Sequence, residues 1–206
     1  MRSVTHAAAL PRGRHAAPRE VVAESQRGRM LVAMAEAVAE RGYTRMAVAD
    51  VIERAGVSRR TFYEHFANKQ ECFLAAYDAG VELLLGAIDR AVAAAGPDLR
   101  AGAAAGTRAY LETLAANPAF ARTFLIEVLA AGPEALARRA AVHERFAEQL
   151  AGIVHEAGLT TPPYVVRACV GAIHELVSDR LLHGDAVALP ELLEPVLDIQ
   201  LRLLGR

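Results

Sequence analysis

The residues best suited to chemistry in this chain stand together in one short polar stretch, Ser58-Arg59-Arg60-Thr61. An arginine guanidinium can donate two parallel hydrogen bonds to guanine, and a threonine methyl group can pack against the methyl group of thymine. Ser58 is a good N-cap, because its hydroxyl can accept a hydrogen bond from a free amide in the first helical turn. The stretch therefore predicts a short helix that presents two arginines to base edges, and it leaves open which of the two reads a base.

A helix-turn-helix unit is the element that would position these side chains. Apolar residues recur at helical spacing from Val48 to Ala55, and Gly56 ends this stripe after two turns. The small residues of Ala55-Gly56-Val57 suit the close crossing of two helices that such a unit requires. A longer helix is predicted before the unit, over about residues 24–41.

Composition and charge favour a helical protein with a basic N-terminal part. The chain has 206 residues and is 53% hydrophobic, with 5 Tyr, 6 Phe and no Trp, and it is rich in alanine, the best helix former. Through residue 75 it carries 12 Lys and Arg against 8 Asp and Glu, and from residue 76 it carries 11 against 16. Any polyanion should therefore bind the first part, while the acidic second part should avoid nucleic acid.

The expected cellular compartment follows from the small number of cysteines and from the lack of a long apolar run in the sequence. Cys72 and Cys169 cannot build a disulfide framework, and no apolar run has the roughly 20 residues that span a bilayer. Residues 1–22 contain a short apolar patch that Pro11 interrupts, unlike a secretory signal, and are predicted to form a disordered basic arm. We expect a cytoplasmic protein with no membrane partner, whose arm is either an inert tail or a further DNA contact.

The rest of the chain predicts six more helices. One begins at Lys69 and ends near Gly96-Pro97, and the others cover about 98–115, 118–131, 133–157, 163–183 and 189–205. The last two carry more apolar side chains than one flank of a small bundle needs to bury. A homodimer through about 163–183 and 189–205 is the favoured interpretation, and closure of the monomer's own bundle is the alternative.

The run from Gly42 to Lys69 resembles the DNA-binding domain of TetR-family (tetracycline-repressor-type) transcriptional regulators. The resemblance covers about residues 24–75 and is carried by Gly42-Tyr43, by Val48 through Phe66, and by Asn68-Lys69. It implies an all-α protein of about nine helices, in which a three-helix DNA-binding domain with a helix-turn-helix precedes a larger helical bundle. We place the DNA-binding domain at 23–70 and the ligand-binding and dimerisation domain at 71–206.

One departure from the family pattern concerns the start of the helix at Val48. The family usually places Thr or Ser just before this position, whereas Met46 and Ala47 stand here. Either the side-chain cap is lost, at a cost of about 1 kcal/mol, or Thr44 caps a helix that starts earlier.

The resemblance also assigns DNA contacts beyond the arginine pair. Tyr63, His65 and Lys69 match family positions that contact phosphates, and Arg45 is the best candidate for an added phosphate contact. A metal at His65 is disfavoured, because no second histidine or carboxylate follows at i+3 or i+4. The expected DNA-binding residues are Arg45, Ser58, Arg59, Arg60, Thr61, Tyr63, His65 and Lys69.

For the second domain the resemblance implies a small-molecule pocket whose occupation changes the separation of two recognition helices. Candidate lining residues are Tyr77, Tyr110, Phe120, Phe124, Phe146 and His174, each of which could instead be ordinary core. His174-Glu175 is the most notable polar spot, because a buried polar group needs a hydrogen-bond partner. The histidines at 143, 155, 174 and 183 are too widely spaced in the sequence to indicate a metal site.

The leading hypothesis is a homodimeric repressor that binds a palindromic operator and is released by an unknown small-molecule effector. The alternative is a helical ligand-binding or protein-interaction module whose helix-turn-helix docks protein, although such a module would not need a basic first domain. An enzyme is not expected, because no catalytic constellation or phosphate-binding loop is visible. Neither a cofactor nor a metal is called for.

Overall fold

The computed structural model describes residues 19–204, with side chains from residue 21, and every element within that range is helical. The prediction of an all-α protein with nine helices is therefore confirmed for this part of the chain. The α-helices are α1 (Arg19–Arg41), α2 (Val48–Ala55), α3 (Arg59–His65), α4 (Lys69–Ala95), α5 (Leu99–Ala116), α6 (Pro118–Leu125), α7 (Pro133–Glu156), α8 (Pro163–His183) and α9 (Leu193–Leu203). Two 3₁₀ helices, η1 (Glu127–Ala130) and η2 (Ala186–Leu192), connect α6 to α7 and α8 to α9.

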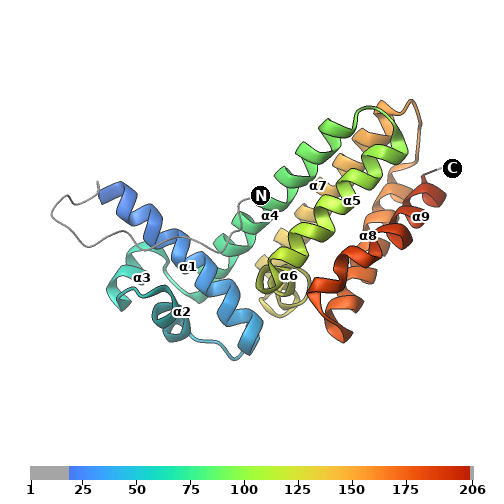
Figure 1. Ribbon diagram of the computed structural model, residues 1–206. Coiled ribbons are helices and arrows are strands. Elements are labelled where there is room, and N and C mark those ends of the chain that lie inside the picture. Colours follow the sequence, from blue (N-terminus) through green and yellow to red (C-terminus); the bar gives the residue numbers. More distant parts are fainter. Residues whose placement is uncertain (1–18, 205–206) are drawn as a thin grey trace.

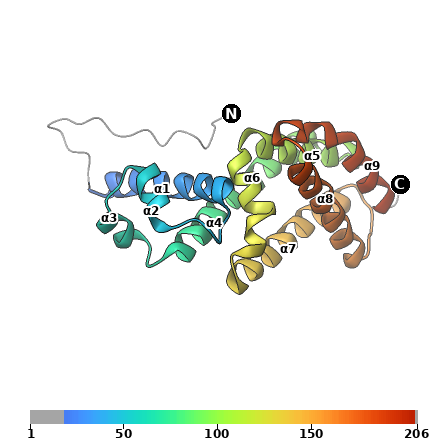
Figure 2. The ribbon, with the colours of Figure 1, turned by 90° about the horizontal axis from the view of Figure 1, so that it is seen from below.

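The helices form two groups joined by α4. Helices α1, α2 and α3 gather at one end of α4, and α5 to α9 surround its other end (Figure 1). The view from below shows the same division, with α6 lying where the two groups meet (Figure 2). Among the described helices, none is both long and apolar enough to cross a membrane.

A single hydrophobic core runs through both groups. It begins with Met30 and Met34 on α1, includes Phe62 on α3, and continues through Tyr77 on α4 to Val196 on α9. A second, smaller cluster closes the far end of the bundle. Because the first three helices share their core with the bundle, burial of apolar surface fixes their position relative to it.

Three helix boundaries differ from the sequence-based prediction. Helix α1 begins at Arg19, so residues 19–22 are helical rather than part of the predicted arm, and residues 1–18 lie outside the described residues. The helix predicted over 118–131 breaks at Ile126 into α6 and η1. The last predicted helix divides into η2 and α9, because Pro190 has no amide hydrogen to continue an α-helical ladder.

Helices α4 and α6 pack closely at Gly80. A Cβ atom at this position would overlap the aromatic ring of Phe120, and Gly80 itself is buried. Glycine is therefore required here by the distance between two helices, since its backbone is ordinary α-helix.

Replacing Gly80 with alanine should destabilise the protein by about 1–3 kcal/mol, because the phenyl ring or α6 must move to admit the methyl group. The matched control is Gly152→Ala on α7, where no atom lies within 4 Å of the added Cβ. That substitution should stabilise by about 0.5–1 kcal/mol, since alanine is the better helix former. Urea unfolding of both variants measures the difference, and equal free energies of unfolding would refute the steric argument.

Candidate nucleic-acid interface and cavity

Ser58 caps α3 and fixes the start of the helix that carries the arginines. Its Oγ accepts a hydrogen bond from the Thr61 amide at 3.0 Å and lies 2.8 Å from the Thr61 hydroxyl. Phe62 anchors the opposite face of the helix in the core. The cap predicted from the sequence is confirmed, and the first turn of α3 is held with its polar side facing outward.

Both arginines of this turn are exposed and only weakly engaged. Arg60 Nε lies 2.9 Å from Glu64 Oε1, with 88% of the arginine side chain accessible. Arg59 lies over the exposed ring of Tyr63, with its guanidinium carbon 5.9 Å from the ring centre. An exposed i,i+4 ion pair contributes only about 0.3–0.5 kcal/mol. Either arginine can therefore leave its present contact for a base or a phosphate.

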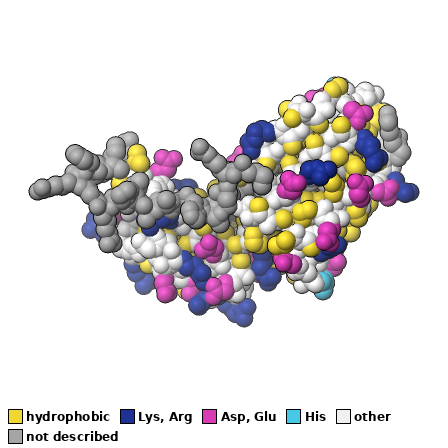
Figure 3. Space-filling model, viewed as in Figure 1, with side chains coloured by type: hydrophobic (Ala, Val, Ile, Leu, Met, Phe, Trp, Pro, Cys, Tyr) yellow, Lys and Arg dark blue, Asp and Glu magenta, His cyan; other side chains and the backbone are white. Residues whose placement is uncertain are grey.

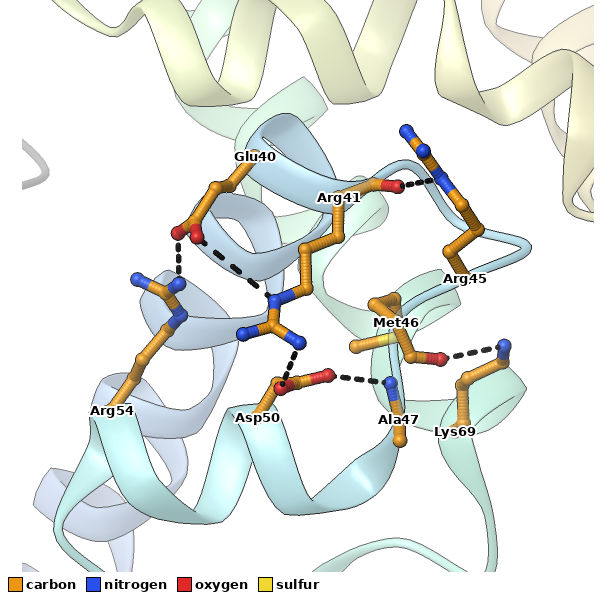
Figure 4. Close-up of polar contacts among 8 residues, drawn as sticks. All are labelled: Glu40, Arg41, Arg45, Met46, Ala47, Asp50, Arg54 and Lys69. Atoms are coloured by element: carbon orange, nitrogen blue, oxygen red, sulfur yellow. Dashed lines mark hydrogen bonds and ion pairs between the residues drawn. The ribbon is translucent and has the colours of Figure 1, made fainter.

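Helix α2 begins without a side-chain cap. It starts at Val48, so an earlier start capped by Thr44 is wrong, and Ala47 occupies the capping position. Asp50 compensates in part, because its carboxylate accepts the Ala47 amide at 2.8 Å and lies 3.1 Å from Arg41 Nη1 (Figure 4). A carboxylate in the first turn also interacts favourably with the helix dipole.

The end of α1 is tied to α2 by a small charged network. Glu40 contacts Arg54 of α2 and Arg41 of its own helix, and Arg41 in turn contacts Asp50 (Figure 4). Arg41 and Arg54 are thus engaged in contacts that join the two helices. Arg45 differs, because its side chain is exposed and makes only one hydrogen bond among the described residues, from Nε to the backbone carbonyl of Arg41.

Lys69 is bound within the protein. Its Nζ donates to the carbonyl oxygens of Tyr43 at 2.9 Å and Met46 at 3.1 Å, and it lies 4.5 Å from the centre of the Tyr43 ring. An ammonium group has three hydrogens, so one remains for a phosphate oxygen. Lys69 thus holds the turn between α1 and α2, a structural role that sequence reasoning missed.

The remaining predicted DNA contacts lie on α3. Tyr63 is 47% exposed, and His65 is half-buried with its ring beside Phe66. In the described part of the chain no three histidine, cysteine or acidic side chains come together as metal ligands would. The arrangement brings a tyrosine, a histidine and two arginines onto one short helix.

A cavity lies inside the C-terminal bundle, between α4, α5, α6, α7, α8 and α9. Its empty space, with the open mouth included, is about 650 Å³. Four of the six predicted pocket residues line it, whereas Tyr77 stacks behind Phe124 and Phe120 packs against Gly80. Those four are Tyr110, Phe124, Phe146 and His174. Core packing, the alternative left open, describes the other two.

Two histidines far apart in the sequence meet at this cavity. His143 on α7 and His174 on α8 both line it, with ring centres 4.8 Å apart, because these helices pack against each other. Burial, Arg139 and His143 lower the pKa of His174 to about 4, so its ring is neutral near pH 7. Glu175 is exposed, so the predicted polar pair His174-Glu175 is divided between the cavity side and the surface.

Glu127 links the bundle to the first group of helices. Its side chain is buried, and its Oε2 accepts the Tyr43 amide at 2.9 Å while Oε1 lies 3.4 Å from Arg122 Nε. Phe124, one turn before it, lines the cavity. Sequence reasoning missed Glu127, because nothing local distinguishes it from a surface glutamate.

Most side chains of the apolar stripes on α8 and α9 are buried inside the monomer or line its cavity. Val166, Cys169 and Val177 are buried, and Val170 and Ile173 line the cavity. Hydrophobic side chains are nevertheless spread over the surface of the bundle between charged ones (Figure 3). Large exposed apolar residues of this region are Tyr164, Leu182, Val187 and Leu203.

Helix α2 and the capped helix α3 form a helix-turn-helix, and a helical bundle follows it in the chain. This arrangement defines a helix-turn-helix protein with a C-terminal helical bundle. Residues 31–76 match the family described as bacterial regulatory proteins, tetR family. The match runs from α1 into α4 and includes both helices of the helix-turn-helix.

Known proteins resemble the chain in sequence over part of its length and in fold over most of it. The HTH-type transcriptional activator FasR of Mycolicibacterium smegmatis is 33% identical over 69 residues, which are 34% of this chain and 32% of FasR. The match thus spans about a third of that relative.

Solved structures share the fold over most of the chain. The fatty acid degradation regulator FadR of Bacillus halodurans has a TM-score of 0.74 at 19% identity, covering 85% of this chain and 94% of its own. FadR of Bacillus subtilis, solved in complex with stearoyl-CoA, has a TM-score of 0.73 at 19% identity over 84% of this chain and 96% of its own. The TetR-family regulator PfmR of Thermus thermophilus has a TM-score of 0.68 at 21% identity over 86% of this chain and 100% of its own.

Lys69→Ala should lower the free energy of unfolding by about 1–3 kcal/mol even without DNA, because two backbone carbonyls lose a charged donor. Arg60→Ala should change it by less than about 0.5 kcal/mol, since that side chain is exposed. Chemical denaturation of the two variants in the absence of DNA measures both values. An unchanged stability for Lys69→Ala would show that the bonds to the turn contribute nothing.

Proposed function

We propose that this protein is a homodimeric transcriptional repressor that binds a palindromic operator and leaves it when a small molecule occupies the cavity. The exposed arginine pair at the capped start of α3 is the observation that carries this proposal. A recognition helix enters the major groove with its N-terminal residues toward the base edges. The match of residues 31–76 to the tetR family of bacterial regulatory proteins supports the same interpretation.

The arginines and their neighbours divide into two kinds of contact. Arg59, Arg60 and Thr61 are suited to base edges, while Arg45, Tyr63, His65 and Lys69 are suited to the phosphate backbone. Ser58 keeps the helix start in place and can donate its hydroxyl to a phosphate. The backbone contacts set the register of the protein, and the base contacts select the sequence.

Glu127 supplies a route from the cavity to the DNA. A ligand that touches Phe124 displaces α6, and the Glu127 carboxylate carries that displacement to the Tyr43 amide between α1 and α2. The ligand shifts operator binding only if it has different affinities for the DNA-bound and released arrangements. In a dimer, the arrangement suited to DNA separates the two recognition helices by about one helical turn, 34–36 Å.

A gel-shift with the DNA upstream of the protein's own gene tests DNA binding. We expect a sequence-selective complex at nanomolar protein that weakens steeply as salt rises, because phosphate contacts release counterions. No selective complex at these concentrations would refute the proposal. Adding the effector to the same reaction should dissociate the complex, and a reporter gene under this promoter should then be derepressed.

Arg60→Ala should weaken operator binding by about 1–3 kcal/mol and leave binding to random DNA nearly unchanged, because a base contact carries sequence information. Lys69→Ala, corrected for its folded fraction, should weaken both kinds of binding equally. Arg100→Ala in the exposed first turn of α5 is the control and should change neither. Titration of each variant with operator and random DNA measures the ratio, and parallel losses for Arg60→Ala and Lys69→Ala would contradict this division of roles.

The dimer is supported by the apolar side chains that α8 leaves on the surface. Leu182 is 55% exposed and Tyr164 73%, and the same helix exposes the small residues Ala168 and Gly171, which permit close approach of a second helix. A two-fold axis would bring two copies of this face together as a self-complementary surface.

Leu182→Arg should weaken the dimer at least tenfold, about 1.4 kcal/mol, because a charge would be buried against its own symmetry copy. Leu83→Arg on α4 is a matched control, since Leu83 is 50% exposed but lies on another face. Light scattering during size-exclusion chromatography over a dilution series measures both. A wild-type protein that stays monomeric at all concentrations would exclude the dimer.

A further inference from the structure

The cavity in the C-terminal bundle has an uncharged wall. Among the described residues that line it, none is Lys, Arg, Asp or Glu, and most are aliphatic or aromatic. Its two histidines, His143 and His174, are neutral near pH 7, because burial and the nearby charge of Arg139 lower the pKa of each ring. An ion that entered the cavity would therefore lose its water shell without meeting an opposite charge, which is costly.

Two charged side chains contact this wall from behind. Arg139 Nη2 lies 3.4 Å from His174 Nε2, and Asp89 accepts a hydrogen bond from the Gln149 amide. His174 and Gln149 line the cavity, whereas Arg139 and Asp89 do not, so a neutral side chain separates each charge from the interior. The two charges differ in sign, so they do not select one kind of ion.

Gln200 of α9 supplies a hydrogen-bond donor to the wall. The residue lines the cavity and is only 6% exposed. Its amide oxygen accepts the Thr107 hydroxyl at 2.9 Å, a contact that joins α9 to α5 and holds the amide in place. Its amide nitrogen makes no hydrogen bond within residues 21–204, and it is not enclosed by protein atoms as the Gln149 oxygen is. Both N–H groups therefore remain for an acceptor in the cavity.

We propose that the cavity binds an uncharged molecule with an apolar body and a carbonyl oxygen, which accepts a hydrogen bond from the Gln200 amide. The apolar body lies along Ile88, Leu150, Ile153 and Ile173. Esters, lactones and ketones have this chemistry, whereas ionised acids, amines and phosphates do not. An apolar pocket with a few placed polar groups is typical of small-molecule sites. This inference rests on the proposed function, because it names the effector class of the same cavity.

Isothermal titration of the full chain with matched probes tests the requirement for an uncharged ligand. Methyl octanoate is neutral, nonanoate has the same carbon and oxygen atoms with a negative charge, and nonylammonium is the corresponding cation. We expect the ester to bind at least tenfold more tightly than either ion, because the wall offers no counterion. An ion that binds as tightly as the ester, or no ester binding up to its solubility limit, would overturn the proposal.

Variants of two glutamines locate the hydrogen bond. Gln200→Leu removes the donor and keeps most of the side-chain volume, so it should weaken ester binding about fivefold. Gln70→Leu on α4, outside the cavity, is the matched control and should leave ester binding unchanged. Should Gln200→Leu fail to fold, Thr107→Val serves in its place, because it frees the amide that the threonine holds and should also weaken ester binding. Full ester affinity in the folded variant overturns the assignment of Gln200.

The same preparations are assayed by gel-shift without any ester, which separates the two proposals. Selective DNA binding with no ester binding would overturn the effector class alone. Ester binding that depends on Gln200 with no selective DNA binding would uphold the uncharged ligand site and refute the regulator.

Discussion

The backbone of Tyr43, in the turn between α1 and α2, is hydrogen-bonded to both groups of helices, and the position of this turn relative to the bundle depends on it. Its amide donates to Glu127 beyond the end of α6, and its carbonyl accepts from Lys69 at the start of α4. One peptide segment is thus held by opposite charges from two different parts of the chain. Charge-assisted hydrogen bonds are stronger than neutral ones, and both lie partly buried, where screening by salt is weak. The turn between α1 and α2 therefore follows the bundle instead of moving by itself.

Helix α4 adds a second constraint on the same geometry. Its buried face runs from Cys72 and Phe73, which pack on the first group of helices, to Leu84 and Ile88 in the bundle. A continuous helix transmits a tilt along its whole length, and Gly80 lets the Phe120 ring of α6 pack directly against the backbone of α4. Helix α6 touches the cavity through Phe124 and the turn through the segment that follows it. If the cavity holds the effector of the proposed regulator, two routes connect it to the DNA-binding helices, one along α4 and one through Glu127.

Much of the fold was predictable from the sequence because its signals are local. Dipeptides that end in proline, such as Asn117-Pro118 and Gly132-Pro133, predicted the boundaries between helices. Ser58 predicted the start of the recognition helix. What sequence reasoning missed depends on contacts between residues far apart in the chain. His143 and His174 meet only because α7 packs on α8, and Lys69 bonds to a turn that precedes it by a whole helix-turn-helix unit. The stripe on α8 was seen correctly as apolar, but periodicity does not tell a monomer core from a dimer interface.

The two helices of the helix-turn-helix are too short to be stable alone. Helix α2 has 8 residues and α3 has 7, whereas isolated helices shorter than about 12–15 residues are marginal in water. Their order comes from Val51, Ala55 and Phe62, which are buried in the core shared with α1 and α4. A displacement of α1 or α4 therefore moves the recognition helix as a packed unit, since unpacking it would expose Phe62 at a cost of about 1.5–3 kcal/mol. In the proposed dimer, rigid movement of Arg59 and Arg60 relative to their copies in the second subunit is accordingly the response that costs less free energy, and it would change DNA affinity while leaving the fold intact.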